Sequence, residues 1–415
     1  MKLTGKSPLC LVPLYYVMYF VWNPADWMFG DAGNIFAKVT VSSYRFALDR
    51  YSNWSSRLWI EGATVFATHH IAWFVVISLG ALLLMVFSLS YACGFETFES
   101  NLLLALCIVG LFPINSLASA GWIATTVNYL WPLAFFIFWL SIFIRRYVNS
   151  SSLPIRMTAL LCLALSVFSE VLAVAAACCL LLEVIIHRRK CVSWFFGFST
   201  LITIAGMLNV LLCPGNAIRK TREISNWFPQ FEEFNIVDRV VIQSVHLATS
   251  VLETYGNLLT VFIIILACLS MVQGRKFLAL LLMMVLMIFT LLGPKAQVDF
   301  QTISDLVHRS QLSHQQIVSI YPMALVFVGS LVLIVVTAAS LFGLTEATVA
   351  VSVPLTISSV IGLAASMSPT LIDSGDRPFI PMYLAIATCS ALVAEKLVTV
   401  AKSAVDLSTR PVGTC

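Results

Sequence analysis

Long apolar stretches separated by short polar segments run through almost the whole chain, and they limit what it can fold into. Of the 415 residues, 60% are hydrophobic and only 11% are charged, whereas soluble domains carry about 25% charged residues. A bilayer crossing takes roughly 20 apolar residues, so the chain has room for about twelve transmembrane helices. The sequence therefore predicts an all-α, polytopic membrane protein in which residues 1–415 form a single integral membrane domain.

The apolar stretches also give approximate bounds for these helices. One block, residues 157–186, is too long for a single crossing and has Glu170 near its middle, so we expect two short helices with Glu170 at the turn. The other predicted helices lie at about residues 9–21, 70–89, 102–117, 133–144, 194–212, 258–271, 277–292, 322–341, 348–367 and 382–394.

Basic residues predict which side of the membrane each connection faces. Short cytoplasmic loops are enriched in Lys and Arg, and such residues fall on one side of the predicted bundle. They are Arg145–Arg146, Arg188–Lys190 and Arg275–Lys276, with Lys2, Lys6, Lys396 and Lys402 near the ends of the chain. That side is predicted to be cytoplasmic, with both termini inside. The longer loops, 23–69, 213–245, 294–321 and 367–379, then face outward.

The first outward loop concentrates ionisable and aromatic residues between two apolar helices, and we expect short interfacial helices within it. Charged side chains at a membrane boundary are costly and usually serve a site. Asp31 is the first candidate for a carboxylate that deprotonates an acceptor hydroxyl, and Asp26 is the second. Asp31 also suits the N-cap of a short interfacial helix formed by the residues after it, and the two roles are compatible.

Trp54, Arg57 and Glu61 form a second group in the same loop. An arginine donates charge-assisted hydrogen bonds to phosphate, so Arg57 is a candidate phosphate contact. Trp54 and Glu61 are candidate substrate contacts beside it. The structural alternative is a helical i, i+4 pair between Arg57 and Glu61, worth only about 0.2–0.5 kcal/mol.

Further candidate contacts lie where later helices begin. Asn128 and Tyr129 precede Trp131-Pro132. Aromatic rings stack on sugar faces, although they equally suit the interfacial belt. Glu170 has no basic neighbour in sequence, and a carboxylate facing lipid is costly. We therefore expect Glu170 to face a cavity or a cationic partner.

Two more groups bring cations to the outer side. Asn216 and Arg219 follow Pro214-Gly215, a dipeptide that favours a tight turn with exposed backbone N–H groups. Such a turn with cations beside it suits a phosphate, and an ordinary solvated turn is the alternative. Arg377 repeats the pattern of an outward arginine just before a helix.

Taken in order, these landmarks resemble a bacterial family. They are the acid after the first helix, WSSR at 54–57, NYLWP at 128–132, Glu170, PGNAIR at 214–219 and Arg377. The chain is similar to bacterial multi-helix glucosyltransferase-like proteins of the GT-C superfamily, which use polyprenyl-phosphate sugars. In that family the two acids after the first helix tend to be adjacent, whereas four residues separate Asp26 from Asp31 here.

The resemblance implies a role for each landmark. Asp31 or Asp26 would be the catalytic base, Arg57, Arg219 and Arg377 would contact phosphate or sugar, and Glu170 would line the site. The implied reaction is an inverting transfer of a hexose from a polyprenyl-phosphate carrier to a cell-envelope glycan or glycolipid, such as lipopolysaccharide O-antigen. It would occur on the outer face of the bacterial inner membrane, without a cofactor or metal.

Other functions fit parts of the pattern. An O-antigen polymerase has a similar helix count but favours a dominant arginine-rich loop late in the chain, whereas the first loop is the most elaborate here. A lipid-linked sugar transporter or flippase predicts broken helices near the middle of the membrane. The net charge of +4 is small and spread over many loops, so it does not indicate nucleic-acid binding.

Overall fold

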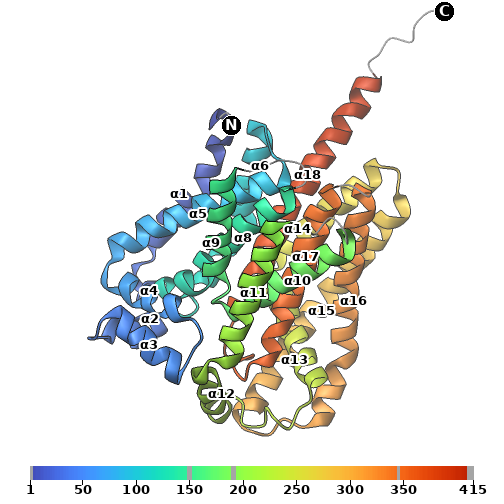
Figure 1. Cartoon of the computed structure of the whole chain (residues 1–415). Helices are drawn as coiled ribbons and strands as arrows, with labels where there is room; N and C mark the ends of the chain where they lie inside the picture. The colour runs from blue at the N-terminus through green and yellow to red at the C-terminus, as the bar shows by residue number, and fades with distance from the viewer. Residues whose placement is uncertain (1–2, 147–151, 188–192, 344–345, 409–415) are drawn as a thin grey trace, which may run out of the picture.

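The computed structural model describes residues 3–146, 152–187, 193–343 and 346–408, and these residues contain helices and connections but no strand (Figure 1). The chain is therefore a helical protein, as predicted. Its longer helices in the first half are α1 (Leu11–Trp22), α5 (Ile71–Cys93), α6 (Phe98–Leu111), α8 (Trp131–Arg145), α9 (Leu153–Ser166), α10 (Glu170–His187) and α11 (Trp194–Leu212). Those in the second half are α13 (Ile236–Thr249), α14 (Gly256–Val272), α15 (Lys276–His308), α16 (His314–Phe342), α17 (Glu346–Ala364) and α18 (Ile380–Ser408).

Six helical segments of the described chain are long and apolar enough to cross a membrane, or up to seven if a bent pair counts as one span. The six are Ile71–Cys93, Trp122–Arg145, Trp194–Leu212, Lys276–His308, His314–Phe342 and Arg377–Ser403. The chain is thus a membrane-embedded, polytopic helical protein. A helix lies at each of the predicted places, but several are short, and a total of twelve spans stays a prediction.

The long apolar block around Glu170 divides as the sequence predicts. α9 ends at Ser166 and α10 begins at Glu170, so the carboxylate lies at the turn between two short helices. The predicted basic segment Arg188–Lys190 lies outside the described residues.

Two of the predicted outward loops are mostly helical. Residues 213–245 contain α12 (Pro214–Trp227) and most of α13. The segment 294–321 is formed by the end of α15, which continues through Pro294, and by the start of α16. With 33 residues, α15 is about 50 Å long at 1.5 Å per residue. A hydrocarbon layer is about 30 Å thick, so the polar second half of α15 extends beyond it.

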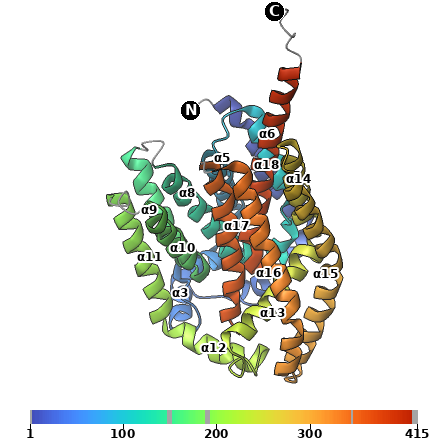
Figure 2. The same cartoon turned by 90° about the vertical axis from the view of Figure 1, so that its right-hand side faces the viewer.

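The two ends of the bundle differ in what they carry. The N-terminal 3-10 helix η1 (Leu3–Cys10) and the end of α18 lie at one end, and α12 and α13 lie at the other (Figures 1 and 2). The first loop joins α12 there. It forms η2 (Pro24–Asp26), α2 (Asp31–Asn34), η3 (Phe36–Lys38), α3 (Ser43–Asn53) and α4 (Leu58–His69). Short helices in this loop are therefore confirmed.

Buried tryptophans hold the centre of the bundle together. Trp131 and Trp139 of α8 donate their indole N–H groups to Ser78 of α5 (3.0 Å) and Ser199 of α11 (3.0 Å). A buried indole N–H without a partner is costly, so these hydroxyls allow large aromatic rings in the core. α8 consequently has a fixed position between α5 and α11. The π-helix η5 (Thr126–Leu130), which carries Asn128 and Tyr129, leads directly into it.

Gly215 fastens the first loop to α12. A Cβ atom at this position would lie 2.4 Å from the Trp54 nitrogen and 2.6 Å from the Tyr51 carbonyl oxygen. The backbone at the end of α3 therefore passes directly over the first turn of α12. The Sγ of Cys213 also donates to the Tyr51 carbonyl at 3.1 Å. Only glycine permits this approach.

We expect Gly215→Ala to destabilise the protein by about 1–3 kcal/mol, because backbone atoms have to move to admit the methyl group. The measurement is the thermal unfolding of purified protein in detergent. Gly197→Ala is the matched control, since a Cβ there meets nothing within 4 Å and alanine favours a helix. Equal melting temperatures for the two variants would contradict the close packing of the first loop on α12.

Candidate functional site

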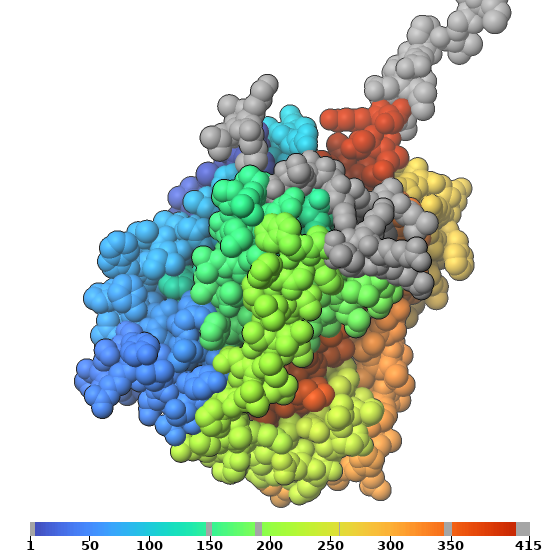
Figure 3. Space-filling model, in the orientation of Figure 1, coloured from blue at the N-terminus to red at the C-terminus, as the bar shows by residue number. Residues whose placement is uncertain are grey.

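Three of the side chains singled out in the sequence meet at the end of the bundle that carries α12. Arg57 precedes α4, Glu170 begins α10 and Arg219 lies in α12. Arg57 contacts Glu170 Oε2 through Nη2 at 2.7 Å and donates to it from Nε at 2.8 Å, and Arg219 Nη1 lies 3.7 Å from Glu170 Oε1. The carboxylate expected to need a partner thus lies between two cations. Figure 3 shows the first loop (blue) and the α12 region (yellow-green) side by side at this end.

Amide side chains brace this meeting point. Asn216 accepts a hydrogen bond from the Ser56 backbone N–H (3.3 Å) and donates to the Val210 carbonyl (2.8 Å). Asn209 donates to the Ser56 carbonyl at 3.1 Å. Pro214 and Gly215 form the first turn of α12 rather than a separate tight turn. The Asn216 amide therefore holds the first loop in place, with its oxygen and nitrogen both engaged within the protein.

Two further ion pairs extend the cluster. Arg50 Nε lies 3.2 Å from Glu61 Oε2, and Arg219 Nε lies 3.4 Å from Glu223 Oε2. The Arg50 guanidinium also covers the Trp54 ring at 4.7 Å. Glu61 therefore pairs with Arg50, and the structural alternative of an i, i+4 ion pair between Arg57 and Glu61 does not form. We call these six residues, Arg50, Arg57, Glu61, Glu170, Arg219 and Glu223, the charge network.

Charges in the network affect one another strongly. Burial opposes ionisation of Glu170, but Arg57 and Arg219 outweigh it and lower its pKa to about 2. Burial raises the pKa of Glu223 against the opposing effect of Arg219 and Arg57, and nearby Glu170 raises it further. Both carboxyls lie outside the candidate membrane spans. Two carboxyls that share Arg219 consequently differ in their affinity for a proton.

The π-helix η5 borders the network. The Arg57 guanidinium lies 5.9 Å from the centre of the Tyr129 ring, so Tyr129 forms a wall beside the cations. Asn128 donates to the Ala124 carbonyl at 2.8 Å and to Thr64 Oγ1 at 3.3 Å. Asn128 thus connects η5 to α4, whereas Tyr129 borders the place where a ligand would contact Arg57.

The predicted acids of the first loop lie in a separate contact. Asp31 Oδ2 lies 3.7 Å from Arg377 Nη1, and the Asp31 side chain is 51% exposed. Asp31 is the first residue of α2, not its N-cap, and Gly30 takes the cap position with φ +58°. Among the described residues, neither Asp31 nor Asp26 forms an ion pair with a member of the charge network. The Asp31–Arg377 contact joins the first loop to the segment that precedes α18.

A helix break supplies a second polar cluster that the sequence did not reveal. The helices over Ile236–Thr254 and Leu258–Val272 meet at 79°, and the break begins with a π-helix, η7 (Ser250–Thr254). Ser250 donates a hydrogen bond to Asp376 Oδ1. Tyr383 nearby is fully buried. π-helical turns occur frequently at functional sites.

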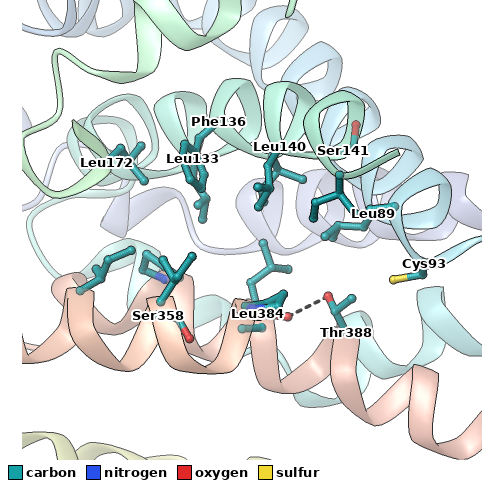
Figure 4. Close-up of a pocket in the computed structure, with 18 residues that line it drawn as sticks. Leu89, Cys93, Leu133, Phe136, Leu140, Ser141, Leu172, Ser358, Leu384 and Thr388 are labelled. Carbon is teal, nitrogen blue, oxygen red and sulfur yellow. Dashed lines mark hydrogen bonds between the residues drawn. The ribbon is translucent and has the colours of Figure 1, made fainter. Parts of the chain in front are cut away.

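An apolar groove runs along α8. No member of the charge network lines it among the residues described. Its wall on α8 is a stripe at helical spacing, formed by Leu133, Phe136, Ile137, Leu140, Ser141 and Ile144. Figure 4 shows Leu133 and Leu140 of this stripe on one side of an open space, with Ser358 of α17 and Leu384 and Thr388 of α18 on the other. The space measures about 780 Å³, part of it open to the surroundings. From Leu133 to Ile144 the stripe is about 17 Å long at 1.5 Å per residue.

Several members of the site were not predicted from the sequence. Arg50 and Glu223 belong to the network, Asn209 braces it, and Asp376 lies at the helix break. A signal for Glu223 existed, since it lies four residues after Arg219, but that segment was predicted to be a loop. No group of three His, Cys, Asp or Glu side chains that could hold a metal ion occurs among the residues described.

No protein-family model, curated protein or solved structure matches this chain. Its resemblance to the glucosyltransferase-like family therefore stays a prediction.

We expect Glu170→Gln to destabilise the protein by about 1–3 kcal/mol at neutral pH, because Arg57 loses its principal partner in a half-buried position. The pKa of Glu170 is lowered from 4.5 to about 2. Its ionised form therefore stabilises the fold above pH 4.5, and this contribution is lost as the pH falls from 4.5 toward 2. The measurement is the melting temperature of both proteins between pH 7 and pH 3.

Wild type should approach the variant's melting temperature as the solution becomes acidic. Glu232→Gln is the control, because Glu232 is 70% exposed and forms its ion pair with Lys220 on the surface. A constant difference between wild type and Glu170→Gln across the whole range would show that the ion pair is not the source.

Proposed function

We propose that this chain is a GT-C-type membrane glycosyltransferase that moves a hexose from a polyprenyl-phosphate carrier to a cell-envelope glycan of the O-antigen kind. The observation that carries the proposal is the position of the apolar groove relative to the charge network. Leu172 of the groove is two residues from Glu170, and Leu133 is four residues from Tyr129. The groove thus begins within about one helical turn of two residues that contact Arg57.

An amphiphile with an anionic head and a long apolar tail fits this arrangement. Arginines bind phosphate through several charge-assisted hydrogen bonds. Arg57 and Arg219 both contact Glu170, which lies two residues before Leu172 of the groove. The stripe on α8 offers an apolar path for the first part of the tail, and its burial is favourable at about 25 cal/mol per Å². A soluble sugar nucleotide has no apolar tail to bury along this stripe, so the groove favours a lipid-linked donor.

The Asp31–Arg377 contact and the charge network would have separate roles in the reaction. The carboxylate of Asp31, with Asp26 as the alternative, takes the proton of the acceptor hydroxyl as its oxygen attacks the anomeric carbon. The bond from that carbon to the phosphate oxygen breaks, and the phosphate leaves with the electron pair. Arg57 and Arg219 stabilise the charge that develops on it. Arg377 orients Asp31 through their contact.

The orientation in the membrane is part of the proposal. The ends that carry Lys6 and Lys396 face the cytoplasm, and the charge network faces outward from the bacterial inner membrane. Arg145 ends α8 and Arg275 precedes α15 at the cytoplasmic end, in line with the positive-inside rule. The glycan acceptor then approaches from outside without crossing the bilayer.

The test is sugar transfer by purified protein in lipid, with a radiolabelled polyprenyl-phosphate hexose and an added acceptor glycan. Asp31→Asn should lower transfer by about 100-fold or more, as expected for loss of a general base, while the carrier still binds. Arg219→Gln should weaken carrier binding. Asp305→Asn, at an exposed position of α15, is the control and should leave transfer unchanged. If wild type binds the carrier but transfers no sugar to any glycan, the enzyme proposal fails.

A specific observation favours one other function, a lipid-linked sugar transporter or flippase. Transporters form their sites at broken helices, and the 79° break between α13 and α14 is such a feature. The same protein in liposomes distinguishes the two functions. A transporter moves the labelled carrier lipid across the bilayer and leaves the sugar attached, whereas the transferase releases sugar to the acceptor with the carrier confined to one leaflet.

A further inference from the structure

The charge network carries no net charge as it stands. Its three arginines, Arg50, Arg57 and Arg219, are matched by Glu61, Glu170 and Glu223. An incoming anion would therefore meet a neutral cluster at the edge of the bilayer, where an unbalanced charge is costly. Binding of an anion requires that one of these carboxylates be displaced or take up a proton.

Arg219 is the cation best able to accept another partner. Its two ion pairs, to Glu170 at 3.7 Å and to Glu223 at 3.4 Å, are both long, whereas charge-assisted hydrogen bonds are usually about 2.7–2.9 Å. Arg57, in contrast, already has contacts of 2.7 and 2.8 Å with Glu170. A new anion consequently gains most by bonding to Arg219.

Glu223 is the carboxyl best able to take up a proton. It is buried, and the charged groups that influence it are Arg219 on its own helix, Arg57 beside α4, Arg50 on α3 and Glu170 on α10. Burial raises its pKa, whereas Glu170 is held ionised by two arginines. An anion bound at Arg219 would weaken the attraction that keeps Glu223 ionised and would add repulsion.

We propose that the site binds an anionic phosphate headgroup together with one proton, the phosphate on Arg219 and Arg57 and the proton on Glu223. The network then has one net positive charge, which balances a phosphodiester of charge −1. Two carboxyls of opposite proton affinity in one cluster mark separate roles: Glu170 stays ionised and holds Arg57 in place, and Glu223 carries the proton. The identity of the anion rests on the proposed function, but the coupling of anion and proton does not.

Titration calorimetry of the full chain in detergent tests this directly. The probe is a short-chain isoprenyl methyl phosphodiester, which keeps one negative charge between pH 5 and pH 8, and the corresponding isoprenol is the uncharged control. At pH 6, in two buffers with different ionisation enthalpies, wild type should take up a fraction of one proton per bound probe. Its Kd should rise by up to about tenfold per pH unit as the pH increases.

Glu223→Gln, which keeps the shape of the side chain, should bind the probe with no proton uptake and with a Kd that does not depend on pH. Glu232→Gln on the neighbouring surface should behave as wild type does. The inference is overturned if wild type binds without proton uptake, if uptake persists in Glu223→Gln, or if the phosphodiester binds no better than the isoprenol.

The same protein preparation separates this inference from the proposed function. Proton-coupled binding without any sugar transfer would leave the inference standing and remove the transferase. Sugar transfer with binding that is independent of pH would support the transferase and overturn the inference. A melting temperature for Glu223→Gln close to that of wild type would confirm that the folded states are comparable.

Discussion

The cost of leaving a charge uncompensated beside apolar helices governs how the α12 end of this bundle is built. Glu170 interrupts an apolar block and lies at the turn between α9 and α10, where its carboxylate needs compensation. Arg57 comes to it from the first loop and Arg219 from α12. Three segments far apart in the sequence are thereby held at one point. Gly215 and the side chains of Asn209 and Asn216 hold the surrounding backbone so that the guanidinium groups stay in reach.

The helical membrane architecture was predictable because its cause is local. Twenty consecutive apolar residues have few alternatives to a helix in lipid, since every backbone polar group must be satisfied within the segment. The turn at Glu170 was predictable for a related reason, because a carboxylate in the middle of an apolar helix would be left without compensation. The need of Glu170 for a compensating environment could thus be read from the chain, although the identity of its cationic partners could not.

The partners themselves depend on contacts between residues that are distant in sequence. The structural alternative for Glu61 was a pair with Arg57 four residues away, but Arg50 of α3 pairs with it instead. Asp31 contacts Arg377, which is 346 residues further along the chain by their numbering (377 − 31). Residues 213–245 were predicted to be a loop because they are polar. They form helices in which side chains four residues apart lie on one face, as the ion pair of Arg219 and Glu223 shows. Periodicity, not polarity, was the informative signal there.

The α12 end of the bundle also has a mechanical property. α15 and α16 extend past the apolar layer as a helical hairpin, and α13 is fastened to that hairpin by the stacking of His246 on Phe300 and by the bond from Tyr321 to Asp238. α14, on the far side of the break, packs against α18 and also against α15. α15 therefore contacts the helices on both sides of the break as well as η7 between them. The break is consequently supported by one continuous helix, and Ser250 within it contacts Asp376, the neighbour of Arg377.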